Sequence, residues 1–276
     1  MTAMIESPSN PRLRAAAGLR ERRERESSGR TLVDGARESR RALEAGARVV
    51  TAFICPDQLG GEDAAAAVDL ARERGAEILE IGPRAFERLA YGDRADGIVL
   101  VVEVPSTDLA SLDLAVVGPE QLVVVTEGLE KPGNLGAILR SADGAGADGV
   151  VTIGGTDLFN PNVIRASVGT IFSVPIAMAT ADETRRWLGE RGLRVVTARV
   201  DAERLHTDAD LTGPLAIVLG SEAEGLSDAW LGQEVESVRL PMLGIADSLN
   251  VSVAAAVLLY EARRQRDVGS VRHTRT

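Results

Sequence analysis

LVVVTEGLEKPGNLGAILRSADGAGADGVVTI, residues 122–153, is the stretch of sequence that decides the fold. Its two apolar runs, Leu122–Thr126 and Gly149–Ile153, have the length and composition of buried strands. Between them, Asn134–Ala145 has the pattern of a helix, and Asn134 is suited to cap its first turn. Strands that are apolar along their whole length and separated by helices predict a parallel sheet covered on both faces.

The same alternation continues towards the C-terminus. We expect a helix at Asn160–Val168, strands at Arg194–Ala198, Leu215–Leu219 and Ser237–Leu240, and a last helix from Leu249 to about Arg266. The last helix is apolar almost all round, which predicts that it is buried. The fold class predicted for this half is therefore an α/β domain built on a parallel sheet.

The first hundred residues alternate in shorter elements. Helices are expected at Pro11–Arg25, Ala36–Ala45, Asp63–Arg74 and Pro83–Ala90, and strands at Thr31–Val33, Val49–Ile54, Glu77–Ile81 and Ile98–Val102. A looser run of Pro, Ser, Asp and Gly at residues 105–119 reads as a linker. The sequence thus predicts a smaller α/β domain at residues 1–108 and a larger one at residues 115–276.

Composition argues against several classes of protein. The sequence has no run of 18 apolar residues that would span a bilayer, and no apolar N-terminal segment followed by a cleavage site. A single cysteine, Cys55, fits a reducing cytoplasm, and we expect it to be a half-buried residue at a strand end rather than a catalytic thiol. With only His206 and His273 besides, a metal site is not expected, nor is a membrane partner.

The formal net charge of −10 is unevenly distributed. Residues 1–48 contain eleven Arg against seven acidic residues, and residues 263–276 contain five Arg against one Asp. Both ends are therefore locally basic, which is compatible with an RNA partner. A solvated helix face with mixed Arg and Glu, as in the run Arg20–Glu26, would explain the arginines of the N-terminal end equally well.

Two loops that follow predicted strands carry unusual chemistry. After Leu122–Thr126 the sequence lacks the G-x-G-x-x-G pattern, which disfavours a dinucleotide site and hence a nucleotide-dependent oxidoreductase. After Leu215–Leu219, Gly220 and Gly225 flank Ser221 and Glu222, and glycines there let the backbone approach a ligand closely.

A third loop, residues 239–250, leads into the last helix. Ser248 or Asn250 opens that helix, and Ser248 is a natural N-cap for it. Ser248, Asn250 and Ser252 also gather polar groups where the helix itself is apolar. These groups need hydrogen-bond partners in the interior or on a ligand.

Four segments in order carry a family resemblance: NLGAILRSA (134–142), NPNVIRASVGTIFSVPI (160–176), IVLGSEAEGLS (217–227) and LPMLGIADSLNVSVAAAVLLYEA (240–262). This set resembles the SpoU, or TrmH-like, ribose 2′-O-methyltransferases of the SPOUT class. The resemblance implies a C-terminal domain with a deep trefoil knot. The N-terminal half resembles the L30e-like substrate-binding domain of the family. The antibiotic-resistance members that act on 23S rRNA, of thiostrepton or avilamycin type, have this two-domain layout.

The resemblance also implies a cofactor, a partner and roles for individual residues. S-adenosylmethionine would be held largely by backbone groups at the cofactor-binding residues, Gly220, Leu240 and Leu249. The chain would form a homodimer through its last helix, with an active site shared between subunits. Arg140 would be the central catalytic residue, surrounded by Asn134, Glu222, Ser248 and Asn250. Because arginine stays protonated, it would clamp an RNA phosphate, oriented by Glu222 and Asn134.

RNA contacts are expected from four arginines, Arg12, Arg14, Arg20 and Arg165, through the phosphate backbone. The expected substrate is 23S rRNA, and methylation could serve either housekeeping or self-protection against an antibiotic. The alternatives are a tRNA ribose 2′-O-methyltransferase, a non-catalytic rRNA-binding factor and a base methyltransferase of the related knotted class.

Overall fold

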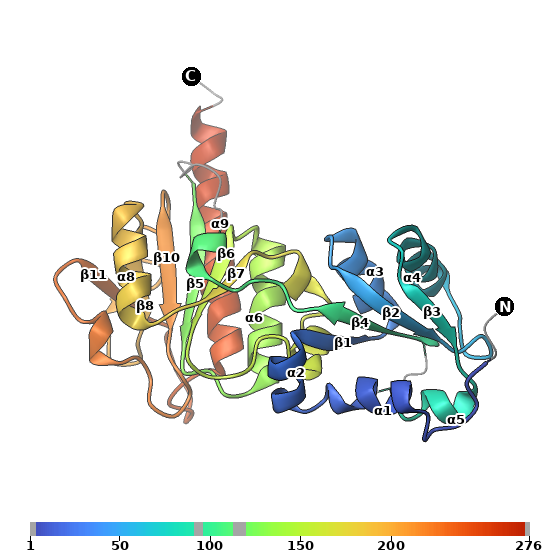
Figure 1. The fold of residues 1–276 in the computed structure, drawn as a ribbon. Helices are drawn as coiled ribbons and strands as arrows, with labels where there is room; N and C mark the ends of the chain where they lie inside the picture. The colour runs from blue at the N-terminus through green and yellow to red at the C-terminus, as the bar shows by residue number, and fades with distance from the viewer. Residues whose placement is uncertain (1–3, 91–95, 113–119, 274–276) are drawn as a thin grey trace. The chain divides into compact units, whose positions relative to one another are not determined.

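The computed structural model describes residues 4–90, 96–112 and 120–273 (Figure 1). The chain divides into two compact units. The N-terminal unit comprises Met1–Pro105 and Asp157–Ser173, and the C-terminal unit comprises Ser106–Thr156 and Val174–Thr276. Of the predicted linker, residues 113–119 lie outside the described residues. Among the described helices, none is long and apolar enough to cross a bilayer.

The N-terminal unit is built around a four-stranded sheet with the order β1-β4-β2-β3. Strand β4 runs antiparallel to both its neighbours, whereas β2 and β3 are parallel. Its elements are α1 (Pro11–Gly18), α2 (Arg22–Ser28), β1 (Arg30–Asp34), α3 (Ala36–Glu44), β2 (Val49–Ile54), α4 (Glu62–Glu73), β3 (Glu77–Glu80), α5 (Pro83–Phe86) and β4 (Ile98–Glu103). The prediction of alternating helices and strands in this half is confirmed.

The helix predicted at Pro11–Arg25 is in fact two helices. Helix α1 ends at Gly18, and α2 begins after Glu21, whose backbone is extended. The break allows the Leu19 side chain to join the buried core, and it lets Arg20 donate to the backbone carbonyls of Leu89 and Ala90, at 3.0 and 2.9 Å. Tertiary packing therefore overrides the helical pattern at this point.

Residues 157–173, which contain α7 (Pro161–Ala166) and the short helix η2 (Thr170–Phe172), pack within the N-terminal unit. The Thr31 hydroxyl donates to the Phe159 carbonyl at 2.7 Å, and Arg41 donates to the Val168 carbonyl at 2.9 Å. The buried Arg25 guanidinium bonds to the Asp157 carboxylate. The compact N-terminal unit thus includes a segment that lies inside the predicted domain 115–276.

The C-terminal unit is built around a seven-stranded sheet with the order β7-β6-β5-β10-β8-β11-β9. All of its pairings are parallel. Its elements are η1 (Leu109–Ser111), β5 (Leu122–Glu127), α6 (Pro132–Ala145), β6 (Gly149–Ile153), β7 (Ile176–Met178), α8 (Ala181–Glu190), β8 (Arg194–Ala198), β9 (Arg204–Leu205), β10 (Leu215–Leu219), η3 (Asp228–Trp230), β11 (Val235–Arg239) and α9 (Val251–His273). The predicted parallel α/β sheet is confirmed, and the trefoil knot stays a prediction.

Helices cover the central strands of this sheet. Helix α8 places Trp187 and Leu188 against Val123 and Val125 of β5, in one apolar core. Helices α6 and α9 lie side by side, with α6 touching β6 and α9 touching β10 (Figure 1). Because side chains alternate along a strand, Val124 faces away from α8. The sequence prediction missed α8, β7 and β9.

Helix α6 begins two residues earlier than predicted. Pro132 occupies its first turn, where its fixed φ and missing N–H suit a helix start. The N-cap is Lys131, without a side-chain capping bond, so Asn134 lies within the first turn and is not the cap. At the start of α9 it is Asn250, not Ser248, whose side chain accepts the backbone N–H of Ser252, at 3.0 Å.

Helix α9 is not buried all round. One set of its side chains, which includes Leu258, Leu259 and Ala262, is fully buried. The apolar side chains of Val253, Val257 and Tyr260 remain exposed. The helix therefore has an uncovered apolar stripe within the chain.

The Arg25–Asp157 pair should stabilise the N-terminal unit. The Arg25 side chain is only 4% exposed, and its guanidinium also donates to two backbone carbonyls. Arg25→Met should lower the free energy of unfolding by about 3 kcal/mol, because Asp157 and the carbonyls lose their partner. Urea denaturation of the full chain measures this. Arg22→Met removes an exposed pair with Glu26 and should have little effect. Equal shifts in both variants would contradict the argument.

Candidate active site

Four neighbouring parallel strands, β5, β10, β8 and β11, end at the same edge of the sheet. The loops that follow them therefore meet there, which is where α/β sheets bind ligands. The loops that follow β5, β10 and β11 are the three polar loops singled out in the sequence. The topology thus brings together segments more than a hundred residues apart in the chain.

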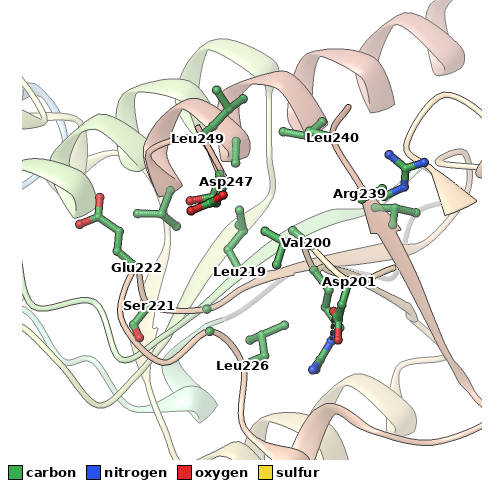
Figure 2. A pocket seen from close by; sticks show the side chains of 18 of the residues that line it. Val200, Asp201, Leu219, Ser221, Glu222, Leu226, Arg239, Leu240, Asp247 and Leu249 are labelled. Carbon is green, nitrogen blue, oxygen red and sulfur yellow. Dashed lines mark hydrogen bonds and ion pairs between the residues drawn. The ribbon is translucent and has the colours of Figure 1, made fainter. Parts of the chain in front are cut away.

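A cavity of about 580 Å³ opens between these loops. Leu219, Leu226, Leu240 and Leu249 contribute apolar walls, with Glu222 at one side and Asp201 and Arg239 at the other (Figure 2). The three residues predicted to bind the cofactor, Gly220, Leu240 and Leu249, all line it. Sequence reasoning missed Ala198–Asp201, Met242 and Asp247. The end of the strand at Ala198 was the available signal for the first of these.

The loop after β10 is closed on itself. Ser221 and Gly225 exchange two backbone hydrogen bonds of 3.1 Å, and the Ser221 hydroxyl accepts the backbone N–H of Glu224 at 3.0 Å. Gly225 has a positive φ of 68°. A Cβ atom on Gly220 would lie 2.2 Å from the backbone of Gly225, so only glycine fits there. This turn gives the cavity one of its walls.

Glu222 joins the starts of two helices. Its Oε1 accepts the side-chain amides of Asn134, at 3.1 Å, and of Asn250, at 2.6 Å. The amide of Asn250 also donates to Oδ1 of Asn134, at 3.2 Å. Three of the five predicted catalytic residues therefore form one hydrogen-bonded cluster at the rim of the cavity.

Lys131 is a member of this cluster that sequence reasoning missed. Its ammonium donates to Oε2 of Glu222, so both carboxylate oxygens of Glu222 have partners. The hydrogen bond from Lys131 is the largest cause that lowers the pKa of Glu222, and the bonds from Asn134 and Asn250 add to it. Glu222 is therefore a carboxylate at neutral pH.

Arg140 and Ser248 do not join the cluster within one chain. Arg140 is exposed on α6, and among the described residues its guanidinium makes no hydrogen bond or ion pair. The expectation that Glu222 and Asn134 orient Arg140 is therefore not met inside the chain. Six residues of helix place Arg140 about 9 Å further along the axis than Asn134. Ser248 lines the cavity.

The predicted RNA-binding arginines have different surroundings in the N-terminal unit. Arg14 is exposed, and Arg12 is exposed and paired with Glu77. Arg20 is half-buried and bound to two backbone carbonyls, so it is less suited to a phosphate than predicted. Arg165 is half-buried on α7.

Cys55 is fully buried rather than half-buried, and burial raises the pKa of its thiol. A buried neutral thiol is inert, which agrees with the expectation of a structural residue. Across the described ranges, no group of three His, Cys, Asp or Glu side chains is arranged to hold a metal ion.

Comparison with known proteins gives two family matches. Residues 121–260 match the SpoU rRNA Methylase family, and residues 10–100 match the MRM3-like substrate binding domain. The 23S rRNA (uridine(2479)-2′-O)-methyltransferase of Streptomyces viridochromogenes is 34% identical over 262 residues, which cover 91% of this chain and 88% of that protein. The 23S rRNA (guanosine-2′-O-)-methyltransferase RlmB of Ralstonia nicotianae is 36% identical, covering 72% and 81%.

Solved structures agree with this assignment. A crystal structure of an RNA 2′-O ribose methyltransferase has a TM-score of 0.83 and 42% identity, covering 95% of this chain and 99% of that one. The SpoU methyltransferase AviRb from Streptomyces viridochromogenes, in complex with AdoMet, has a TM-score of 0.82 and 31% identity, covering 93% and 98%. The sequence, the fold and the site lead to one conclusion: this chain belongs to the SpoU rRNA methylase family.

Proposed function

We propose that this protein transfers a methyl group from S-adenosylmethionine to the 2′-hydroxyl of a ribose in 23S rRNA. The observation that carries this proposal is the hydrogen-bonded cluster of Asn134, Glu222 and Asn250 at the rim of the cavity. A protein that only bound RNA would not need such a cluster beside a small-molecule cavity. The relatives named above as 23S rRNA 2′-O-methyltransferases support the reaction and the class of RNA.

The cavity fits S-adenosylmethionine. Its volume lies within the range of roughly 300–1,000 Å³ typical of small-molecule sites. Leucine side chains suit the adenosine and thioether surfaces, while the loop backbones at Gly220, Leu240 and Leu249 offer hydrogen-bonding groups. Asp201 and Glu222 of the lining are ion-paired with Arg199 and Lys131, whereas the negative charge of Asp247 favours a cationic ligand. When bound, S-adenosylmethionine supplies an electrophilic methyl group.

The chain must align the ribose and find an acceptor for the hydroxyl proton. Glu222 is unsuited to be the base, because its pKa is lowered and its Oε1 accepts the side-chain amides of Asn134 and Asn250. Arg140 is always protonated and cannot accept a proton. We infer that Arg140 clamps the RNA phosphate in a bidentate contact and leaves a phosphate oxygen to take the proton. Ser248, on the cavity wall, would position the ribose or the cofactor loop.

The N-terminal unit is proposed to hold the RNA. Its match to a substrate-binding domain supports this role, and Arg12 and Arg14 lie exposed on it. Such contacts act on phosphates without reading sequence. With 23S rRNA as the substrate, the reaction is expected in the cytoplasm.

A homodimer through α9 would complete the site. Leu249, Val253, Val257 and Tyr260 are 38%, 48%, 37% and 53% exposed, respectively. Val253, Val257 and Tyr260 are spaced four and three residues apart, which puts them on one stripe of α9, and Leu249 lies just before the helix. An uncovered apolar stripe marks an interaction surface, and the same stripe on a second copy gives an isologous contact.

Arg140 lies beside this stripe. A Cβ atom on Gly144 would meet the Tyr260 hydroxyl at 2.7 Å, so Gly144 faces Tyr260. Arg140 is one turn before Gly144 and shares its face of α6. We infer that Arg140 reaches the cluster of the partner, and this agrees with the fact that Glu222 bonds Asn134 and Asn250 but not Arg140 within one chain.

The reaction is tested with purified protein, methyl-labelled S-adenosylmethionine, and protein-free 23S rRNA, intact large subunits and bulk tRNA in separate reactions. We expect label in 23S rRNA and one ribose-methylation stop in reverse transcription. Arg140→Ala should lose transfer by at least a hundredfold, in line with loss of a principal electrostatic contact of about 3 kcal/mol. Its affinity for S-adenosylmethionine should be unchanged.

Label in tRNA would overturn the choice of substrate. Absence of both label and cofactor binding would favour the non-catalytic RNA-binding factor. If 23S rRNA is labelled, expression in a sensitive host shows whether methylation protects against ribosome-targeting antibiotics.

Gly220→Ala should weaken S-adenosylmethionine binding roughly tenfold or more, equivalent to about 1.4 kcal/mol. The added methyl group would collide with the Gly225 backbone and open the closed turn. Isothermal titration calorimetry measures this without any RNA. Gly189→Ala is the matched control, because a methyl group added at that position on α8 would have no other group within 4 Å. Equal affinity in the two variants would show that the turn does not shape the cofactor site.

Val257→Glu should convert the dimer into a monomer, because a carboxylate would be buried against the partner's apolar stripe. Light scattering coupled to size-exclusion chromatography reads the mass directly. Leu231→Glu is a matched control, since Leu231 is 52% exposed and lies outside α9. A monomeric wild-type chain, or a dimer that persists in Val257→Glu, would contradict the assignment of the interface.

A further inference from the structure

Lys131 is the one lysine of the sequence, since the 31 Lys and Arg residues comprise 30 Arg and this Lys. It lies at the start of α6, beside the cluster of Asn134, Glu222 and Asn250. Everywhere else this chain uses the guanidinium group for its positively charged side chains. A compact ammonium on a flexible stem therefore occurs only at the rim of the cofactor cavity.

The hydrogen bonds that hold Oε1 of Glu222 do not involve Lys131. Oε1 is held by the amides of Asn134 and Asn250, whereas Lys131 bonds only to Oε2. The Lys131 side chain is 71% exposed, against 32% for Glu222. Glu130 is a further acidic neighbour, which attracts the Lys131 ammonium without bonding to it. Lys131 can therefore leave Glu222 while the carboxylate stays in place.

The chemistry of lysine suits an exchange between two anions. An arginine fork would bind a carboxylate in a fixed, bidentate way, whereas an ammonium is a point charge with freely rotating donors. An exposed ion pair contributes little to stability, so breaking it costs little. A phosphate presents the same kind of oxygen acceptor as a carboxylate.

We propose that Lys131 exchanges the Glu222 carboxylate for a backbone phosphate of the bound RNA, and so positions the target strand at the rim of the cofactor cavity. The proposal rests on the proposed RNA substrate and adds a contact to it. Lys131 acts separately from Arg140, which lies nine residues, or about 13 Å of helix, further along α6. The released Glu222 keeps its two amide donors and thus continues to hold the starts of α6 and α9.

The test is the salt dependence of binding to protein-free 23S rRNA, measured by filter binding between about 50 and 300 mM KCl. Lys131→Gln should bind more weakly at low salt, and the slope of log K against log[KCl] should shrink by about 1, the value for one lost phosphate contact. Lys131→Arg keeps the charge and should retain most of the slope. The affinity of Lys131→Gln for S-adenosylmethionine, measured by calorimetry without RNA, should equal that of the wild type.

Two further variants separate a phosphate contact from a structural role. Arg204→Gln removes the same charge from another exposed ion pair, with Glu236, and should leave the slope unchanged. In a Glu222→Gln background, the effect of Lys131→Gln on the slope should persist. A wild-type slope in Lys131→Gln, or an effect that vanishes in the Glu222→Gln background, would overturn the proposal. Failure of the wild type to methylate any RNA would instead count against the proposed function, because the slopes are measured without methyl transfer.

Discussion

The C-terminal unit depends on how α9 is fixed at both ends of the strands, near their amino ends by Arg266 and near their carboxyl ends by Asn250. At the amino ends the buried Arg266 guanidinium donates to backbone carbonyls at Glu120, Gln121, Leu211 and Gly213, just before β5 and β10 begin. Burial lowers the pKa of Arg266, yet an arginine stays charged, so these carbonyls are its required partners. At the carboxyl ends Asn250 binds the Glu222 carboxylate. The helix spans the 16 residues between them, about 24 Å. The apolar stripe on α9 therefore has a fixed position relative to the cofactor cavity.

Glu222 shows how the fold assigns chemical roles to residues of similar type. Its Oε1 accepts the side-chain amides of Asn134 and Asn250, which tie it to the starts of α6 and α9, so it acts as a structural anion. Asp201 and Asp247 also line the cavity outside this cluster, and Asp201 is paired with Arg199, so the negative charge of Asp247 is the one that can act on a cationic ligand there. Besides the bond from Lys131, the hydrogen bonds from Asn134 and Asn250 lower the pKa of Glu222 and remove the nearest candidate for a general base, so the proposed proton acceptor is a phosphate oxygen of the substrate. Whether a carboxylate at this site can act as a base thus depends on the hydrogen bonds that it already accepts, and not only on its presence in the cavity.

Local signals in the sequence predicted the central strands β5, β6 and β10 well, since these strands are mostly apolar and their ends are marked by glycine or polar residues. Helix α8 was missed although its capping box, Thr180 and Glu183, can be read from the sequence. Asn134 was wrongly taken as a cap because Pro132 is the stronger signal for a first turn. The packing of residues 157–173 into the N-terminal unit depends on contacts such as Thr31 with Phe159, which no local pattern encodes. Lys131 could have been singled out in the sequence by a different signal, because it is the one lysine among the 31 Lys and Arg residues.

The position of Arg140 connects the proposed chemistry to the proposed assembly. Within its own chain it stands about 1.7 turns of helix beyond Asn134, with its guanidinium bonded to neither Glu222 nor Asn250. A monomer would thus hold the cofactor cavity and the amide cluster intact and still lack the arginine that clamps phosphate. Since Arg140 shares a face of α6 with Gly144, which faces Tyr260, a second copy docked on the stripe would meet Arg140 at the edge of the contact. In the proposed dimer, one chain would suffice to bind the cofactor, whereas two chains would be needed to transfer the methyl group.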